Sequence, residues 1–97
     1  MTEPVSALQN METATWSPED GTAYEVALEG INHVVGAYSG LIAEAEAAVD
    51  TERAEQLAAE QRRWSARRKS LTPADRAAVD AVTAECAQLL QQLRRTA

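Results

Sequence analysis

The stretch "YEVALEGINHVVGAYSGLIAEAEAAV", residues 24–49, shows the strongest periodicity in the chain and decides its fold. Apolar residues recur along it in alternating steps of four and three: Tyr24, Leu28, Ile31, Val35, Tyr38, Ile42, Ala45 and Val49. This spacing places them along one edge of an α-helix, as in a heptad seam. Further residues widen that edge on one side: Ala27, Val34, Leu41 and Ala48. The pattern predicts a long first helix, over about residues 18–48, with its seam buried.

Two short phrases predict where helices begin. "WSPED" (residues 16–20) and "LTPAD" (residues 71–75) each place an apolar residue before a hydroxyl residue, a proline and an acidic residue. A hydroxyl side chain caps a helix N-terminus, proline suits the first helical position, and a carboxylate is favoured at the positive end of the helix dipole. We therefore expect one helix to begin at Pro18 and another at Pro73, capped by Ser17 and Thr72.

Past Val49 the seam stops, because its continuation would fall on Glu52 and Gln56. A new stripe begins out of phase: Ala54, Leu57, Gln61, Trp64, Arg68 and Leu71. This break predicts a turn at Asp50–Thr51 and a second helix over about residues 51–69, and the alternative is one continuous helix with a stutter. The third helix, about 73–95, has its own stripe: Val79, Val82, Cys86, Leu89 and Leu93.

These elements predict an all-α fold, a three-helix antiparallel bundle or helical hairpin with a long first helix. It forms a single domain over residues 16–97, which follows a flexible, disordered tail over residues 1–15 because chain ends without periodicity are usually poorly ordered. Helices two and three are each shorter than helix one, so one chain would leave part of the seam bare. We therefore predict a homodimer with helix one at or near its interface.

The charge is divided unevenly along the chain, whose formal net charge is −6. Residues 1–50 hold nine Asp and Glu and no Lys or Arg, whereas residues 51–97 hold nine Lys and Arg against six Asp and Glu. The two halves should attract each other, within one chain or between two copies, and the acidic balance argues against general nucleic-acid affinity. The excess of Ala and Arg is typical of a GC-rich bacterial genome.

The sequence shows no pattern that places the chain in or across a membrane. Its most apolar run is about ten residues long, half of what spans a bilayer, and the N-terminus lacks the pattern of a secretion signal. The single cysteine, Cys86, allows no internal disulfide. We therefore predict a cytoplasmic protein that makes no membrane contact.

No catalytic pattern is visible either. The chain has no Gly-rich phosphate loop, no Cys or His spacing that suits a metal, and no nucleophile beside a base. We expect a non-enzymatic protein with no catalytic residue, cofactor or metal. Cys86 lies in a stripe and is interpreted as a buried core residue. His33 is interpreted as a surface residue paired with Glu29, one turn earlier, and a pH-sensing or ligand role is the alternative.

The stretch "QRRWSARRKS", residues 61–70, carries five of the nine basic residues: Arg62, Arg63, Arg67, Arg68 and Lys69. On a helix these charges surround the axis instead of forming one ribbon. We interpret them as the counter-charge of the acidic first helix, with Arg68 extending over the core to a carboxylate. The alternative is an accessory nucleic-acid-binding protein that uses this cluster.

Small residues follow the back of the first helix, opposite the seam. Gly30, His33, Ala37, Gly40, Glu44 and Ala47 recur in steps of three and four, and Gly36 with Gly40 forms G-x-x-x-G. Each interior glycine costs a helix about 1 kcal/mol relative to alanine, so close approach of another helix is the expected gain, and tolerated surface glycines are the alternative. We predict an adaptor or regulatory subunit with these partner-binding candidates: Gly36, Gly40, His33, Ala37, Arg62, Arg63, Arg67 and Lys69.

Overall fold

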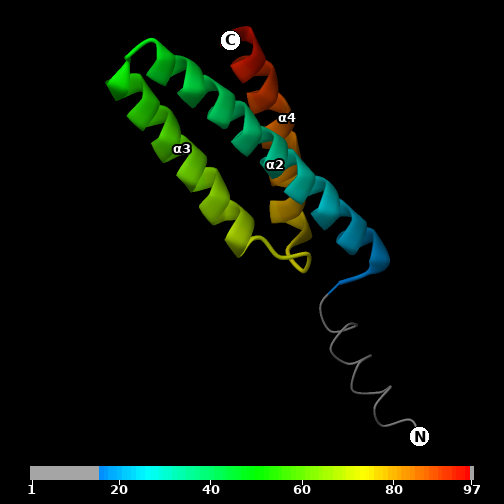
Figure 1. Cartoon of the computed structure of the whole chain (residues 1–97). Coiled ribbons are helices and arrows are strands. Elements are labelled where there is room, and N and C mark those ends of the chain that lie inside the picture. The colour runs from blue at the N-terminus through cyan, green and yellow to red at the C-terminus, as the bar shows by residue number, and fades with distance from the viewer. Residues whose placement is uncertain (1–15, 97) are drawn as a thin grey trace, which may run out of the picture.

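The computed structural model describes residues 16–96, and over this range the regular elements are all helices. They are α2 (Pro18–Ala47), α3 (Thr51–Ser70) and α4 (Arg76–Thr96). Each helix runs opposite to the one before it, and α2 lies between the other two (Figure 1). The predicted all-α bundle with a long first helix is therefore confirmed. The predicted tail, residues 1–15, lies outside the described residues.

The start of α2 is the one that "WSPED" predicts. The Ser17 Oγ accepts a hydrogen bond from the Asp20 N–H at 3.2 Å, and the Asp20 carboxylate accepts one from the Ser17 N–H at 3.2 Å. This reciprocal capping box satisfies two backbone donors that the helix leaves unpaired. Pro18 occupies the first turn, as predicted.

The turn between α2 and α3 is also where the broken seam predicts it, which excludes one continuous helix. The Asp50 N–H donates to Ala45 O at 2.8 Å and the Val49 N–H donates to Glu46 O at 3.0 Å. This pair of bonds is a Schellman motif, whose penultimate residue must be left-handed. Here that residue is Val49, with φ at 58°, a conformation that a β-branched side chain rarely adopts. Asp50 then caps α3 by accepting from the Arg53 N–H.

The start of α4 differs from the prediction by three residues, because α4 begins at Arg76 and not at Pro73. Thr72 closes a turn instead: its Oγ1 accepts from the Ala74 N–H and its carbonyl accepts from the Asp75 N–H. The cap is Asp75, whose carboxylate accepts from the Ala78 N–H at 3.1 Å. Thr72 and Asp75 of "LTPAD" could each cap this helix. The helix begins after Asp75, which lies nearer to the apolar stripe of α4.

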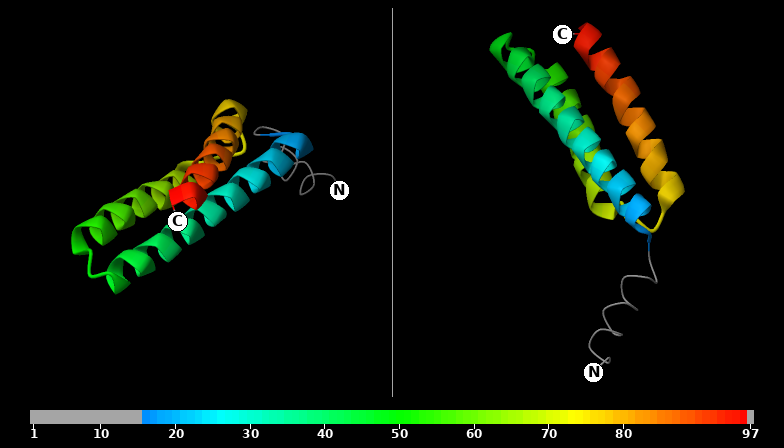
Figure 2. Two further views of the ribbon diagram at one scale, coloured as in Figure 1. Left: turned by 90° about the horizontal axis from the view of Figure 1, so that it is seen from above. Right: turned by 90° about the vertical axis from the view of Figure 1, so that its right-hand side faces the viewer.

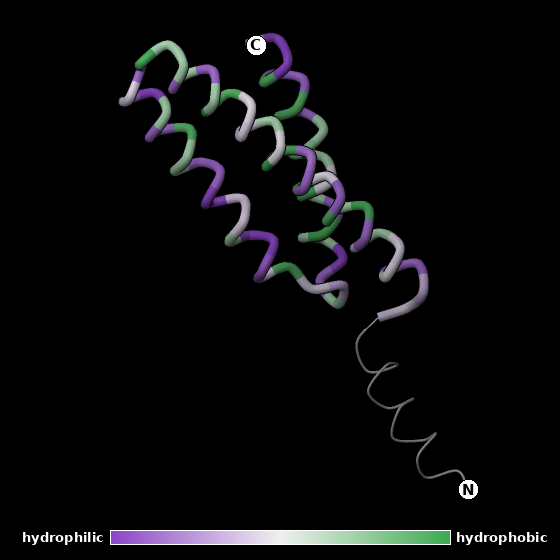
Figure 3. Tube along the Cα trace, viewed as in Figure 1, coloured by the Kyte–Doolittle hydropathy of each residue, from purple (hydrophilic) through white to green (hydrophobic). Residues whose placement is uncertain are grey.

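The core lies along α2, which packs against α3 on one side and α4 on the other (Figure 2). Its buried members come from all three helices: Ala27, Ile31, Val34, Tyr38, Leu41, Ala45, Ala54, Leu57, Val79, Val82 and Cys86. The tube coloured by hydropathy shows green segments of α2 turned toward its neighbours, whereas α3 is mostly hydrophilic (Figure 3). Within the described residues, the Cα atoms of α3 and α4 nowhere approach within 8 Å.

From Ile31 onward, buried and half-buried residues alternate along the predicted seam, and its last residue is exposed. Ile31 and Tyr38 are buried, Tyr24 and Ile42 are half-buried, and Val49 is 82% exposed. Of the four residues predicted only to widen the seam, the first three are buried and Ala48 is exposed. One chain therefore covers the centre of α2 with its own helices and leaves the seam's ends partly open.

Candidate functional site

Arg67, a member of the predicted basic cluster, joins α3 to α4. Its guanidinium donates two hydrogen bonds to the Glu85 carboxylate, at 2.7 and 3.3 Å, and lies 4.5 Å from the ring centre of Trp64. The bonds to Arg67 lower the pKa of Glu85, and the same bonds raise the pKa of Arg67. Arg67 therefore joins α3 to α4, and the Glu85 carboxylate balances its positive charge.

The other basic residues of α3 point in several directions. Arg68 donates from Nε to the Asn32 Oδ1 at 3.2 Å, so the prediction that it reaches a carboxylate is wrong. Arg63 lies 3.7 Å from Glu60 on its own helix. Arg62 and Lys69 are exposed and form no hydrogen bond or ion pair within residues 16–96. The cluster is dispersed around the helix, as the sequence predicts, and leaves two unpaired cations.

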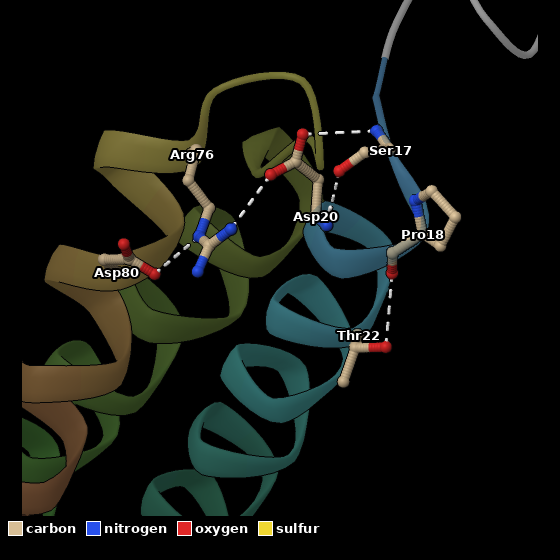
Figure 4. Close-up of polar contacts among 6 residues, drawn as sticks. All are labelled: Ser17, Pro18, Asp20, Thr22, Arg76 and Asp80. Carbon is tan, nitrogen blue, oxygen red and sulfur yellow. Dashed lines mark hydrogen bonds and ion pairs between the residues drawn. The ribbon is translucent and has the colours of Figure 1, made fainter.

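The expected neutralisation of α2 by α3 does not occur through ion pairs. In residues 16–96 the ion pair that joins α2 to another helix is Asp20 with Arg76 of α4, at 3.0 Å, and Arg76 also binds Asp80 at 2.9 Å (Figure 4). Hydrogen bonds from Ser17 and Arg76 lower the pKa of Asp20. The other carboxylates of α2 lie on its exposed surface: Glu19, Glu25, Glu29, Glu44 and Glu46. In residues 16–96 none of these five carboxylates forms an ion pair with a cation of α3.

Polar contacts fix the register between α2 and α3. The Tyr38 hydroxyl donates to the Glu60 carboxylate at 2.8 Å, and the Gln61 amide donates to Val35 O at 2.9 Å and Ser39 Oγ at 2.8 Å. Burial, together with the bond to Glu60, raises the pKa of Tyr38 to about 12. The sequence places Gln61 in the apolar stripe of the second helix but does not identify its hydrogen-bond partners. The presence of an amide in this stripe was the one sign that it bonds to a neighbouring helix.

The glycines predicted to line one face of α2 divide into two groups. A Cβ atom on Gly30 would lie 3.2 Å from Cys86 Cβ, so Gly30 is where α4 approaches α2 most tightly among these glycines. The same atom on Gly36 or Gly40 would meet no neighbouring group within 4 Å. Close helix approach therefore explains Gly30 within the chain, and Gly36 and Gly40 remain open to solvent.

The open part of this helix surface is lined by small side chains. We call it the small-residue face, and it consists of four exposed residues at helical spacing: Gly36, Gly40, Ala43 and Ala47. His33 is exposed beside it and forms no ion pair with Glu29 in the described part of the chain, so that predicted pairing is wrong. Ala37 is half-buried.

No group of side chains in the described residues converges as a reactive site would. An open shelf of about 700 Å³ lies beside the first turns of α2, with Arg68 at its edge. Residues 16–96 contain no cluster of His, Cys, Asp or Glu that could hold a metal ion, and no buried side-chain polar atom there lacks a partner. Cys86 is buried, as predicted, and burial raises the pKa of its thiol, which disfavours the reactive thiolate.

None of the helices described here has the length and apolar character needed to cross a membrane. Comparison with known proteins finds no matching family model, no matching curated protein and no matching solved structure. The functional proposal therefore rests on the geometry of the helix surfaces.

Proposed function

We propose that this chain is a small, non-enzymatic helical interaction protein, an adaptor or regulatory subunit that binds a protein partner and a second copy of itself. The observation that carries the proposal is the small-residue face of α2, where Gly36 and Gly40 are open to solvent. Without side chains at these positions, the backbone of a partner helix can approach closely.

The internal contact at Gly30 supports this use of glycine. In α2 a glycine that faces α4 lets a second helix pack within van der Waals contact. Gly36 and Gly40 carry the same helix-propensity cost, about 1 kcal/mol each relative to alanine, and no neighbour among residues 16–96 explains them. A partner helix on this face would provide that explanation.

The charge of α2 defines the kind of partner. Six carboxylates and no Lys or Arg lie between Pro18 and Ala47, and five of these carboxylates make no ion pair in the described residues. A helix with basic residues flanking a narrow apolar edge fits such a surface best. We further propose a cytoplasmic location, which is the one expected from the sequence.

The nucleic-acid alternative receives less support from the geometry. Strong binding to a phosphate backbone requires several simultaneous contacts. In the basic cluster Arg67 and Arg63 already contact carboxylates and Arg68 contacts Asn32, so Arg62 and Lys69 alone remain unpaired. Fluorescence polarisation with labelled duplex DNA at low salt tests the alternative, and tight, salt-sensitive binding would revive it.

The experiment that tests the proposal compares Gly36→Leu and Gly40→Leu with Ala87→Leu, a matched substitution on the exposed surface of α4. Each variant is used as bait in quantitative pull-downs from native extract, after circular dichroism has shown that it folds. We expect the two glycine variants to lose partners that wild type and Ala87→Leu retain, because a leucine side chain holds the partner helix away. Equal recovery by all four proteins would refute the role of the small-residue face.

A further inference from the structure

The outward side of α3 carries a second regular strip that the fold leaves uncovered. Six residues in steps of three and four form what we call the α3 strip: Glu52, Glu55, Ala59, Arg62, Ala66 and Lys69. All are exposed except Ala59, which is half-buried. At 100° per residue they share one side of the helix, away from the Ala54–Leu57 edge that packs on α2. Figure 1 shows α3 at the outer edge of the molecule, with α2 and α4 together on its other side.

The charges of this strip are ordered along the helix. Its first two residues, Glu52 and Glu55, are acidic, whereas Arg62 and Lys69 in its second half are basic. None of the four forms an ion pair within residues 16–96. The neighbouring charges of α3 are different in this respect, because Arg63 and Glu60 pair with each other and Arg67 pairs with Glu85.

The charges on two copies of the α3 strip are complementary only when the two helices run antiparallel. In an antiparallel pair the heptad positions match Glu52 with Lys69, Glu55 with Ala66, and Ala59 with Arg62 of the second copy. Glu55 then lies between Arg62 and Lys69 of that copy, and the alanines keep the two helices close. In a parallel pair Glu52 would meet Glu52 and Arg62 would meet Arg62, so like charges would repel.

We infer that the second copy of this chain docks on the α3 strip, as an antiparallel two-fold pair held by Glu52 and Glu55 of each copy against Arg62 and Lys69 of the other. A two-fold axis passes beside Ala59 and Arg62, and the contact is isologous. This inference rests on the self-association in the proposed function and locates it on α3, whereas the sequence predicts an interface at or near the first helix. The location is separate from the small-residue face of α2, which stays available for another protein.

Two charge-reversal variants test the inference. The first, Glu52→Lys with Glu55→Lys, makes the strip wholly basic, and the second, Arg62→Glu with Lys69→Glu, makes it wholly acidic. The matched control is Arg94→Glu with Arg95→Glu in α4, which changes net charge as the second variant does but lies outside the strip. Sedimentation velocity and light scattering at low salt measure association, and circular dichroism confirms that each variant is folded.

Wild type and the α4 control should dimerise, each reversal variant alone should be monomeric, and an equimolar mixture of the two should form a heterodimer. We expect the dissociation constant of each reversed homodimer to rise by more than about tenfold, which corresponds to about 1.4 kcal/mol. Raising the salt to 1 M should weaken the wild-type dimer, because it shortens the Debye length to about 3 Å. Recovery in the mixture also shows that the reversed chains kept their fold.

A wild-type chain that is monomeric at the highest attainable concentration overturns the inference. So does a dimer that survives both reversals, which would mean that the charge order of α3 serves only the helix dipole. The glycine variants separate this result from the proposed function: Gly36→Leu should still dimerise while losing its protein partner. If Gly36→Leu is monomeric and the reversal variants dimerise, the second copy lies on α2 instead.

Discussion

Replacing Gly30, Gly36 and Gly40 by alanine, one at a time, should separate the inner from the outer side of α2, because one identical change meets two different surroundings. At Gly36 and Gly40 the added methyl group enters open space. The expected effect is the helix-propensity difference alone, a gain of about 1 kcal/mol in the free energy of unfolding for each substitution. For a domain of this size that gain raises Tm by roughly 4–8 °C.

At Gly30 the same gain is opposed by a steric cost. The new Cβ would lie 3.2 Å from Cys86 Cβ, and the latter cannot turn away because it is bonded directly to the backbone of α4. Val79, Val82 and Cys86 are all buried against α2, so α4 would have to shift as a whole. Overpacking of this kind costs about 1–3 kcal/mol. The propensity gain offsets part of it, and Gly30→Ala should lower the free energy of unfolding by about 1 kcal/mol.

Urea unfolding followed by circular dichroism measures the three variants against wild type, with light scattering at the same concentrations to exclude a change of association. The expected order of stability is Gly36→Ala and Gly40→Ala above wild type, and Gly30→Ala below it. Slopes with urea should be unchanged, since the surface exposed on unfolding is the same. If Gly30→Ala proves as stable as Gly36→Ala, the tight contact between α2 and α4 is refuted.

Three further predictions concern single side chains. Val49→Gly should stabilise the fold by about 1 kcal/mol in urea unfolding, because a β-branched residue is strained at a φ of 58°; a loss of stability would mean that Val49 makes a contact that outweighs its strain. The fold raises the pKa of Tyr38 to about 12, so above pH 10 this tyrosine ionises in the unfolded chain first, and the free energy of unfolding should fall between about pH 10 and 12. Tyr38→Phe should remove that fall. If the free energy of unfolding of the variant falls as steeply with pH as that of wild type, the prediction is wrong. Arg67→Gln should lower the free energy of unfolding by about 1 kcal/mol, because the pairing with Glu85 and the stacking on Trp64 are lost. Arg67 lowers the pKa of Glu85, so the pair stabilises the fold above the ordinary carboxylate pKa, and this contribution is lost as the pH falls through the lowered pKa. The stability of the variant should therefore depend less on acid pH than that of wild type.

The helices and their order could be predicted from the sequence because each depends on local signals. The seam of residues 24–49 marks the buried side of α2, Ser17 and Pro18 mark its start, and the loss of phase after Val49 marks its end. These signals act over a few residues and require no knowledge of what packs against them.

The predictions that were wrong depend on which of several nearby residues a side chain or helix contacts. The periodicity of α2 shows that one side is buried, but the exact centre of burial depends on where α4 crosses, and Cys86 against Gly30 decides this. In the same way, the sequence predicts that Arg68 reaches a carboxylate, but its position on α3 brings its guanidinium to the Asn32 side chain. At the start of α4, two residues of one phrase compete as the cap, and local rules do not rank Asp75 above Thr72.

The way α4 is attached has a consequence for how the molecule opens. Its buried residues Val79, Val82 and Cys86 pack in the core along α2, and in the described residues the Arg67–Glu85 ion pair joins it to α3. Leu89, Leu90 and Leu93 are half-buried, so its second half is held more loosely than its first. We therefore expect amide protons of α4 to exchange with solvent through detachment of this helix before the hairpin of α2 and α3 unfolds.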